Sequence, residues 1–384
     1  MASDKPRIVI FTDWYLPGYK AGGPIQSCVN LVAHLHDRFD FFVVCSDRDY
    51  LEEQPYPHVK IGETEQVGAA RVRYLSPRER SFRSIRKIVK QLAPDRVYIN
   101  GMFSPTFSIY PLMAARSLGL PTTVAPRGML APGALAIKPM KKKVFLNALS
   151  LLGAYKSVEF HATNAVESAQ IRRHIGLNAQ IAEVPNIPGL TQIERANATT
   201  HKNKNHLNVL TTARLAREKN IAFALECLAE LPDHIRVNQT FIGSAYDEKY
   251  AGQCGELAQK LPDHVRVEFS GPKPPREVAE KLGESHLFFL PTLGENYGHA
   301  IIEALLAGVP ALISDRTPWR NLVRDGLGLD ADLAEKRIFV DYLVKLAEMD
   351  GEEYKEQFKN VGANARRLID TDALRRGYID LLSR

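Results

Sequence analysis

Two carboxylates separated by seven residues mark the stretch of this chain that is best suited to bind a polar ligand. Glu295 follows an apolar run at 287–290 that predicts a short buried strand, and Glu303 lies in a helical pattern that ends at Gly308 and Pro310. In an open α/β sheet, ligands bind at such strand-to-helix crossings. The helix start offers N–H groups to a phosphate, and fixed carboxylates accept hydrogen bonds from sugar hydroxyls. These residues predict a nucleotide-sugar site.

Two cations follow another predicted strand, at 207–213. Arg214 and Lys219 would stand at its carboxyl end, where they can clamp a diphosphate and neutralise the charge that grows on it as it leaves. The alternative interpretation of the two cations is that they are solvated surface charges. The alternative interpretation of a single carboxylate is that it caps a helix. The Gly-Glu-Asn-Tyr-Gly context at 294–298 disfavours both alternatives.

A third candidate is the glycine pair Gly22-Gly23, which precedes Pro24 at a predicted helix start. Glycines allow a backbone to approach a ligand closely at such a position. The segment lacks GxGxxG and has no acid at the expected distance, so a dinucleotide-binding dehydrogenase is disfavoured.

Strand and helix patterns alternate around these candidates. In the first half the predicted strands are 7–12, 39–45, 96–99, 122–125, 158–161 and 181–184, and the predicted helices are 24–35, 85–92, 105–118, 138–152 and 164–175. A second series has strands at 208–212, 237–242, 265–269, 287–290 and 311–313, followed by a mostly helical tail from Asp330. This alternation predicts α/β domains with doubly wound parallel sheets.

The chain has 384 residues, so two domains are expected. A polar segment rich in Asn, Thr, Lys and Pro predicts a linker between them. We expect an N-terminal domain at 1–188, the linker at 189–206, a C-terminal domain at 207–365 and a final helix at 366–384.

Composition limits the class of protein. Hydrophobic residues make up 45% and charged residues 24%, as in ordinary globular proteins. The net charge of +6 favours anionic partners such as sugar nucleotides or anionic lipid but is too weak to indicate nucleic acid. No apolar run reaches the ~18 residues of a membrane helix, the start lacks a signal-peptide pattern, and the four cysteines form no CxxC pair. We therefore expect a cytoplasmic protein with reduced core thiols.

With these motifs in place, the chain resembles the retaining glycosyltransferases of family four (glycosyl transferases group 1), which have the GT-B fold. Glu295 through Glu303 matches the family's E-x7-E motif, Arg214 and Lys219 match its "RL…EK" loop, and Gly22-Gly23 matches its N-terminal glycine loop. Weaker likenesses are Val184-Pro185-Asn186 to its "PN" sequence and Gly271-Pro272-Lys273 to its base-contacting loop. Segments 125–130 and 315–319 resemble members of the bacterial surface-polysaccharide type.

The resemblance implies two Rossmann-like domains facing across a cleft, the first for the acceptor and the second for the nucleotide-sugar donor, with the final helix returning to the first domain. It implies that Glu303 holds the donor ribose, that Glu295 and the following N–H groups hold the donor sugar and phosphate, and that Gly23 lets its loop cover the diphosphate. The implied catalytic residues are Glu295, Arg214 and Lys219. The implied donor-binding residues are Gly22, Gly23, Gly243, Asn296, Tyr297, Gly298, His299 and Glu303, and those on the acceptor side are Lys20, Asn100 and Arg127.

The implied reaction moves a hexose from a UDP- or GDP-linked sugar to a saccharide or lipid-linked saccharide with retention, in polysaccharide or glycolipid biosynthesis. It needs no cofactor beyond the donor substrate. Three Asp-x-Asp triplets, at 47–49, 330–332 and 370–372, fit a metal-binding string by chance, so no metal is expected. The alternatives are a GT-B nucleotide-sugar epimerase and a non-catalytic sugar-nucleotide binding protein.

Three departures from the family stand out: Arg127 where many members carry a histidine, a short loop at 243–245, and Asn220 where glycine is usual. The basic start of the helix at 138–152 precedes apolar residues, which predicts either a core helix with a solvated end or contact with an anionic membrane at the cytoplasmic face. Trp319 is interpreted as a packing anchor.

Overall fold

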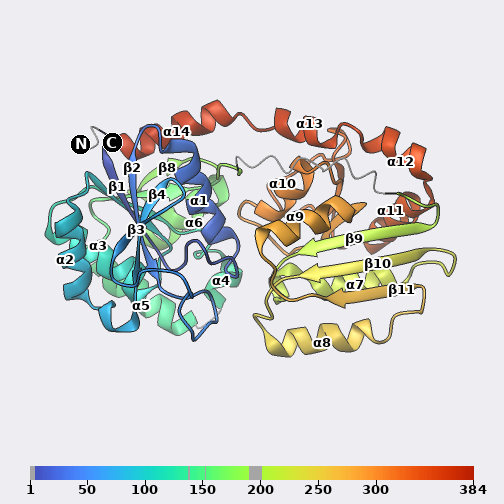
Figure 1. Ribbon diagram of the computed structural model, residues 1–384, viewed down its shortest axis with the longest axis horizontal. Coiled ribbons are helices and arrows are strands. Elements are labelled where there is room, and N and C mark those ends of the chain that lie inside the picture. The colour runs from blue at the N-terminus through green and yellow to red at the C-terminus, as the bar shows by residue number, and fades with distance from the viewer. Residues whose placement is uncertain (1–4, 137–138, 152, 190–200) are drawn as a thin grey trace. The chain divides into compact units, whose positions relative to one another are not determined.

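The computed structural model describes residues 5–136, 139–151, 153–189 and 201–384, which divide into two compact α/β units. Unit 1 contains the described residues up to 189 together with 371–384, and unit 2 contains 201–370 (Figure 1). The linker predicted at 189–206 lies partly outside the described residues. Its described end, from 201 on, leads directly into the first strand of unit 2.

Unit 1 is built on an eight-stranded sheet in the order β3-β4-β2-β1-β5-β6-β7-β8. All neighbouring strands are parallel except β3 and β4. The strands are β1 (Arg7–Thr12), β2 (Asp40–Ser46), β3 (Thr64–Val67), β4 (Ala70–Leu75), β5 (Arg96–Asn100), β6 (Thr122–Ala125), β7 (Val158–Ala162) and β8 (Gln180–Glu183). The hairpin of β3 and β4 was not predicted, because polar residues interrupt its apolar pattern at the edge of the sheet.

Helices cover both faces of this sheet and enclose two apolar clusters. They are α1 (Gly23–Leu35), η1 (Pro77–Glu79), α2 (Phe82–Leu92), the π-helical turn η2 (Pro105–Ile109), α3 (Tyr110–Ser117), α4 (Pro132–Ala136), α5 (Pro139–Leu151), α6 (Ala165–Ile175) and α14 (Thr371–Ser383). Asn164 caps α6 by accepting a hydrogen bond from Glu167 N, as its sequence position predicts. The helix predicted at 105–118 is divided into η2 and α3.

Unit 2 has a six-stranded, fully parallel sheet in the order β11-β10-β9-β12-β13-β14. Its strands are β9 (His206–Thr212), β10 (Arg236–Ile242), β11 (Val265–Phe269), β12 (Leu287–Leu290), β13 (Ala311–Ser314) and β14 (Gly328–Ala331). Its helices are η3 (Arg217–Lys219), α7 (Ile221–Ala229), α8 (Glu248–Ala258), α9 (Pro275–Glu284), α10 (His299–Leu306), α11 (Lys336–Glu348), α12 (Gly351–Phe358) and α13 (Val361–Arg367). The edge strand β14 was not predicted.

The C-terminal tail divides between the units. α13 belongs to unit 2, whereas α14 belongs to unit 1, where Tyr378, Leu381 and Leu382 are buried and the Tyr378 ring packs against His161 of β7. The single helix expected at 366–384 is therefore the end of α13 followed, after a break, by α14.

The strand orders identify where each sheet can bind a ligand. In unit 1 the order reverses beside β1, which lies between β2 and β5; in unit 2 it reverses beside β9, between β10 and β12. Loops at the carboxyl ends of such strands diverge to opposite faces and leave a crevice between them. The loops concerned are those after β1 and β5 in unit 1 and those after β9 and β12 in unit 2.

The four cysteines are buried and unpaired, as expected for core thiols. Among the described residues, no helix combines the length and the apolar character needed to cross a bilayer.

Candidate active site

The loop from β12 to α10 carries the first predicted carboxylate and is held rigidly. The ring N–H of Trp319 donates to the Tyr297 carbonyl at 2.6 Å, and the Tyr297 ring packs edge-on against Trp319 and His299. The Glu295 N–H donates to the Arg316 carbonyl at 3.2 Å. Trp319 is thus the packing anchor that was predicted, and the loop is fixed before any ligand arrives.

Gly298 ends this loop in a left-handed conformation that favours glycine. Its φ is +79°, and a Cβ added there would lie 2.9 Å from Ile301 Cδ1. Gly298 caps α10, so the first N–H groups of that helix have no intrahelical acceptor. This is the anion-attracting geometry that the sequence predicts for the loop.

Lys219 and Glu295 form a direct ion pair between the two switch-point loops of unit 2. Their side chains are only 17% and 12% exposed, so water screens the pair weakly. Backbone contacts join the same loops, because Leu293 N and Thr292 Oγ1 both donate to the Glu218 carbonyl, at 2.8 and 2.9 Å. The structure therefore brings two predicted catalytic residues together.

Arg214 lies in the same loop after β9 but does not pair with Glu295. Its guanidinium donates to Glu218 at 3.2 Å and lies over the Tyr246 ring, with Cζ 4.8 Å from the ring centroid. The side chain is 36% exposed. A half-exposed guanidinium held by one surface carboxylate can exchange that partner for a stronger anion.

Glu303 lies half-buried in the second turn of α10. Burial raises the pKa of its carboxyl group to about 7. Within the part of the chain that the structure describes, no side chain donates to this carboxylate or pairs with it. A carboxylate that is desolvated and lacks a protein donor is suited to receive hydroxyl donors from a ligand.

Gly243 has a structural reason for being glycine. A Cβ there would lie 2.0 Å from the Ala213 carbonyl oxygen, and the Gly243 N–H already donates to the Gly271 carbonyl at 3.0 Å. It therefore lets the ends of β9 and β10 approach each other, and its own N–H is not available to a donor phosphate.

The next residue, Ser244, was not among the predicted site residues. It is 8% exposed, and its Oγ has no hydrogen-bond partner among the described residues. The signal in the sequence is its place directly after the predicted strand at 237–242, next to the glycine.

In unit 1, Gly22 has a φ of +66° and caps α1, whose first residue is Gly23. Asn100 ends β5, and its side-chain amide donates to the Pro24 carbonyl at 3.1 Å. The structure thus links the glycine loop directly to one residue predicted for the acceptor side. Lys20, another of these residues, forms an ion pair with Glu52, so its ammonium group already has a carboxylate partner.

Arg127 follows β6 with a φ of +55°, which is unusual for a residue other than glycine. Its guanidinium donates to Asn100 Oδ1 at 2.7 Å, to Tyr98 Oη at 2.7 Å and to Asn186 Oδ1. The neighbouring Gly128 N–H donates to the buried Glu167 carboxylate at 2.6 Å. Arg127 is therefore held by three side chains at the carboxyl end of the sheet, and its hydrogen bond to Asn100 fixes the orientation of that amide.

Asp13 lies at the switch point of unit 1 and was not among the predicted site residues. It follows β1, and a Cβ added at Gly101, directly after β5, would lie 4.0 Å from its Oδ2. Burial raises the pKa of its carboxyl group, while hydrogen bonding to Ser104 and the charge of Arg80 act in the opposite direction. Its position directly after the first strand is the signal that the sequence offers.

Within the described ranges, no group of three or more His, Cys, Asp or Glu side chains could hold a metal ion. In the first Asp-x-Asp triplet, Asp47 pairs with Arg48 and Arg80, and Asp49 accepts backbone N–H groups. In the second, Asp330 pairs with Arg320.

Residues 192–366 match the family model described as Glycosyl transferases group 1. Over 136 residues, the chain is 28% identical to the phosphatidyl-myo-inositol mannosyltransferase of Mycobacterium leprae, a match that covers 35% of this chain and 34% of that protein.

Solved structures match over almost the whole chain. HepE from Anabaena in complex with UDP-glucose has a TM-score of 0.72 at 16% identity, with 98% of this chain and 99% of that chain covered. Sucrose-phosphate synthase from Thermosynechococcus elongatus has a TM-score of 0.71 at 15% identity, with 98% of each chain covered. WaaG, a glycosyltransferase of lipopolysaccharide biosynthesis, has a TM-score of 0.67 at 15% identity, with 98% and 99% covered. The chain therefore has the GT-B fold, and its C-terminal unit matches the model of the glycosyl transferases group 1 family.

Proposed function

We propose that this protein is a retaining, metal-independent glycosyltransferase. It moves a hexose from a nucleotide diphosphate sugar to a hydroxyl of a saccharide or lipid-linked saccharide. The observation that carries the proposal is the ion pair of Lys219 and Glu295 at the switch point of unit 2, beside a carboxylate, Glu303, whose pKa is raised by burial. One edge of the sheet thus combines cations that can bind a diphosphate with carboxylates that can bind sugar hydroxyls.

Each residue has a role in this proposal. The Glu303 carboxylate accepts the ribose hydroxyls, and the buried Ser244 hydroxyl donates to the donor phosphate. Lys219 and Arg214 neutralise the charge that develops on the diphosphate as the glycosidic bond breaks. Glu295 accepts hydroxyls of the donor sugar, and because Lys219 pairs with it, it is an anchor rather than a nucleophile.

The names of similar proteins define the donors to test first. One similar structure contains UDP-glucose, and the curated relative is a mannosyltransferase. We therefore propose a UDP- or GDP-linked hexose and no other cofactor. Because the sequence match covers only about a third of that relative, both donors are compared directly.

The acceptor is assigned to the switch point of unit 1. There Asp13 offers a half-buried carboxylate, and Asn100 is held in place by Arg127. A carboxylate suits the hydroxyls of a neutral sugar better than it suits an anionic group, and Asn100 supports this edge through its hydrogen bonds with Thr12, Pro24 and Arg127. The acceptor portion bound by unit 1 is therefore a neutral sugar residue.

Contact with a membrane surface is proposed for α5. Met140 and Val144 lie one turn apart on this helix and are 75% and 61% exposed, while Lys141 and Lys143 beside them are also exposed. Exposed apolar side chains flanked by lysines favour an anionic lipid surface, which would place the protein at the cytoplasmic face. Leu146, farther along the helix, is buried and anchors it to unit 1.

The decisive experiment measures nucleoside diphosphate release from UDP-glucose and from GDP-mannose, with and without an acceptor saccharide. We expect acceptor-stimulated release from one donor and a loss of about 100-fold or more in Lys219→Ala and in Glu295→Ala. Lys281→Ala is the matched control, because Lys281 forms an exposed ion pair with Glu284 in the same unit. Full turnover in both site variants would refute the assignment, and the absence of release from either donor in the presence of acceptor would favour a binding protein or an epimerase.

Membrane contact has its own test. We expect the protein to float with vesicles of phosphatidylglycerol but not of phosphatidylcholine, and we expect Val144→Asp to abolish flotation. Val166→Asp, at another exposed apolar residue of unit 1, serves as control. Flotation that Val144→Asp leaves unchanged would exclude α5 as the contact.

A further inference from the structure

The glycine loop of unit 1 is held by a second loop, in which Asp49 binds its backbone and Glu52 pairs with Lys20. We name residues 47–56, which follow β2, the support loop. Asp49 Oδ2 accepts hydrogen bonds from Tyr19 N at 2.9 Å and from Lys20 N at 3.2 Å, while Oδ1 accepts from Tyr50 N at 2.7 Å. Asp49 is 6% exposed, so these charge-assisted bonds are shielded from water.

The two loops also pack closely where they meet. A Cβ at Gly18 would lie 2.2 Å from the Tyr56 hydroxyl oxygen and 3.0 Å from Asp49 Oδ1. The Tyr19 carbonyl in turn accepts the Gly22 N–H at 3.1 Å. A continuous path of hydrogen bonds thus runs from Asp49 through Tyr19 to Gly22, which caps α1.

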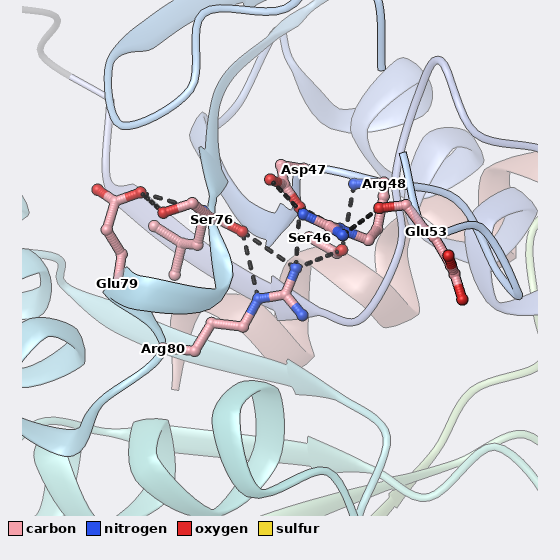
Figure 2. A network of polar contacts seen from close by, with 8 residues as sticks. Ser46, Asp47, Arg48, Glu53, Ser76, Glu79 and Arg80 are labelled. Atoms are coloured by element: carbon pink, nitrogen blue, oxygen red, sulfur yellow. Dashed lines mark hydrogen bonds and ion pairs between the residues drawn. The ribbon is translucent and has the colours of Figure 1, made fainter. Parts of the chain in front are cut away.

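The support loop has a rigid base of its own (Figure 2). Arg80 donates to Asp47 Oδ1 at 3.0 Å and to Ser46 Oγ at 2.8 Å. Arg48 donates to Asp47 Oδ1 at 2.8 Å and also to the Glu53 carbonyl, which closes the loop on itself. Asp47 is buried between the two guanidinium groups, so the base is a compensated charge cluster rather than a flexible surface contact.

We propose that Asp49 is a positioning residue that fixes the Gly22-Gly23 loop in its working conformation before the donor binds. The inference rests on the proposed function and on the role that the family resemblance implies for this loop, which is to cover the donor diphosphate. Ordering a loop that contains glycines costs conformational entropy. If the loop is already ordered in the free protein, this cost does not add to the activation free energy of the reaction. Asp49 supplies this order without touching the donor.

The first test uses hydrogen–deuterium exchange on the ligand-free full-length protein, in peptides that span 15–24. We expect Asp49→Ala to speed exchange at Tyr19 and Lys20 by about tenfold or more, because both N–H groups lose their acceptor. Glu53→Ala is the matched control in the same loop, since Glu53 is exposed and contributes its backbone carbonyl. Unchanged exchange in Asp49→Ala would overturn the proposal whatever the enzyme does.

The second test uses kinetics with whichever of UDP-glucose or GDP-mannose the wild type consumes. We expect Asp49→Ala to lower kcat by roughly 10- to 100-fold, with Asp49→Asn intermediate, because the amide keeps one acceptor oxygen. Binding of UMP or GMP, which lack the second phosphate, should change less than about threefold, since the ribose contact is assigned to Glu303 of unit 2. Faster exchange with an unchanged kcat would refute the link to catalysis. A wild type inactive with both donors would refute the proposed function and leave the exchange test to decide the loop contact.

Should Asp49→Ala fail to fold, Asp49→Asn answers both questions. It retains the shape of the side chain and should speed exchange at Tyr19 and Lys20 less than the alanine variant would, yet measurably, because a neutral oxygen is a weaker acceptor than a carboxylate. Exchange and kcat that both equal the wild-type values in Asp49→Asn would overturn the proposal.

Discussion

Replacing Glu303 by glutamine should stabilise the free protein and weaken its binding of nucleotide. Burial raises the pKa of Glu303 from 4.5 to about 7. The unfolded chain therefore releases this proton near pH 4.5, and the folded protein releases it only near pH 7. The stability that the protonated carboxyl group provides is complete below pH 4.5, is lost as the pH rises toward 7, and stays lost above it.

The size of the effect follows from these two values. A pKa difference of about 2.5, which is 7 minus 4.5, corresponds to roughly 3 kcal/mol at pH 8 and to only about 1 kcal/mol at pH 5. Glutamine imitates the protonated group at every pH. Glu303→Gln should therefore raise the melting temperature by roughly 5–10 °C at pH 8 and by much less at pH 5.

The assay is thermal unfolding at pH 5 and pH 8, with and without UDP. Glu295→Gln is the matched comparison with the opposite expected sign, because it leaves the weakly exposed Lys219 without its partner and should cost about 1 kcal/mol. The stabilisation of Glu303→Gln by UDP should be smaller than that of the wild type, since an amide is a weaker acceptor for ribose hydroxyls. A gain that is equal at the two pH values, or a loss at pH 8, would refute the account of Glu303.

Three further predictions concern residues that stabilise unit 2, each measured by chemical denaturation. Gly243→Ala should cost at least about 3 kcal/mol or prevent folding, because its Cβ would meet the Ala213 carbonyl at 2.0 Å, whereas Gly252→Ala, with open space around it, should be neutral or stabilising. Lys202→Met should cost roughly 2–3 kcal/mol, since the ammonium group of Lys202 donates to the carbonyls of Asn203, Ala347 and Met349; a cost below about 0.5 kcal/mol would contradict this. Trp319→Phe should cost about 1–2 kcal/mol and lower donor turnover, because the Tyr297 carbonyl loses its donor; wild-type turnover would show that this anchor does not matter to the site.

Much of the fold could be predicted because its signals are local. Buried parallel strands such as β1 and β12 are continuous apolar runs, and they were found within a residue or two. The elements that were missed lie at sheet edges: β3 and β4 mix polar with apolar residues, and β14 contains a glycine and an aspartate. Such strands are recognised by their neighbours, which are distant in the sequence.

The sequence by itself determined the residue types at the site. The carboxylates Glu295 and Glu303, the cations Arg214 and Lys219 and the glycines 22, 23 and 298 could be identified because a strand that ends in a glycine-rich helix start is a local pattern.

Only the tertiary structure decided which of these groups act on one another. Lys219 and Glu295 are 76 residues apart, yet they pair directly, while Arg214 turns to Glu218. Burial, which depends on the whole unit, sets the pKa of Glu303, and Asp49 reaches Tyr19 across 30 residues of chain. Desolvation and long-range hydrogen bonds depend on the packed three-dimensional surroundings, and spacing along the chain does not encode them.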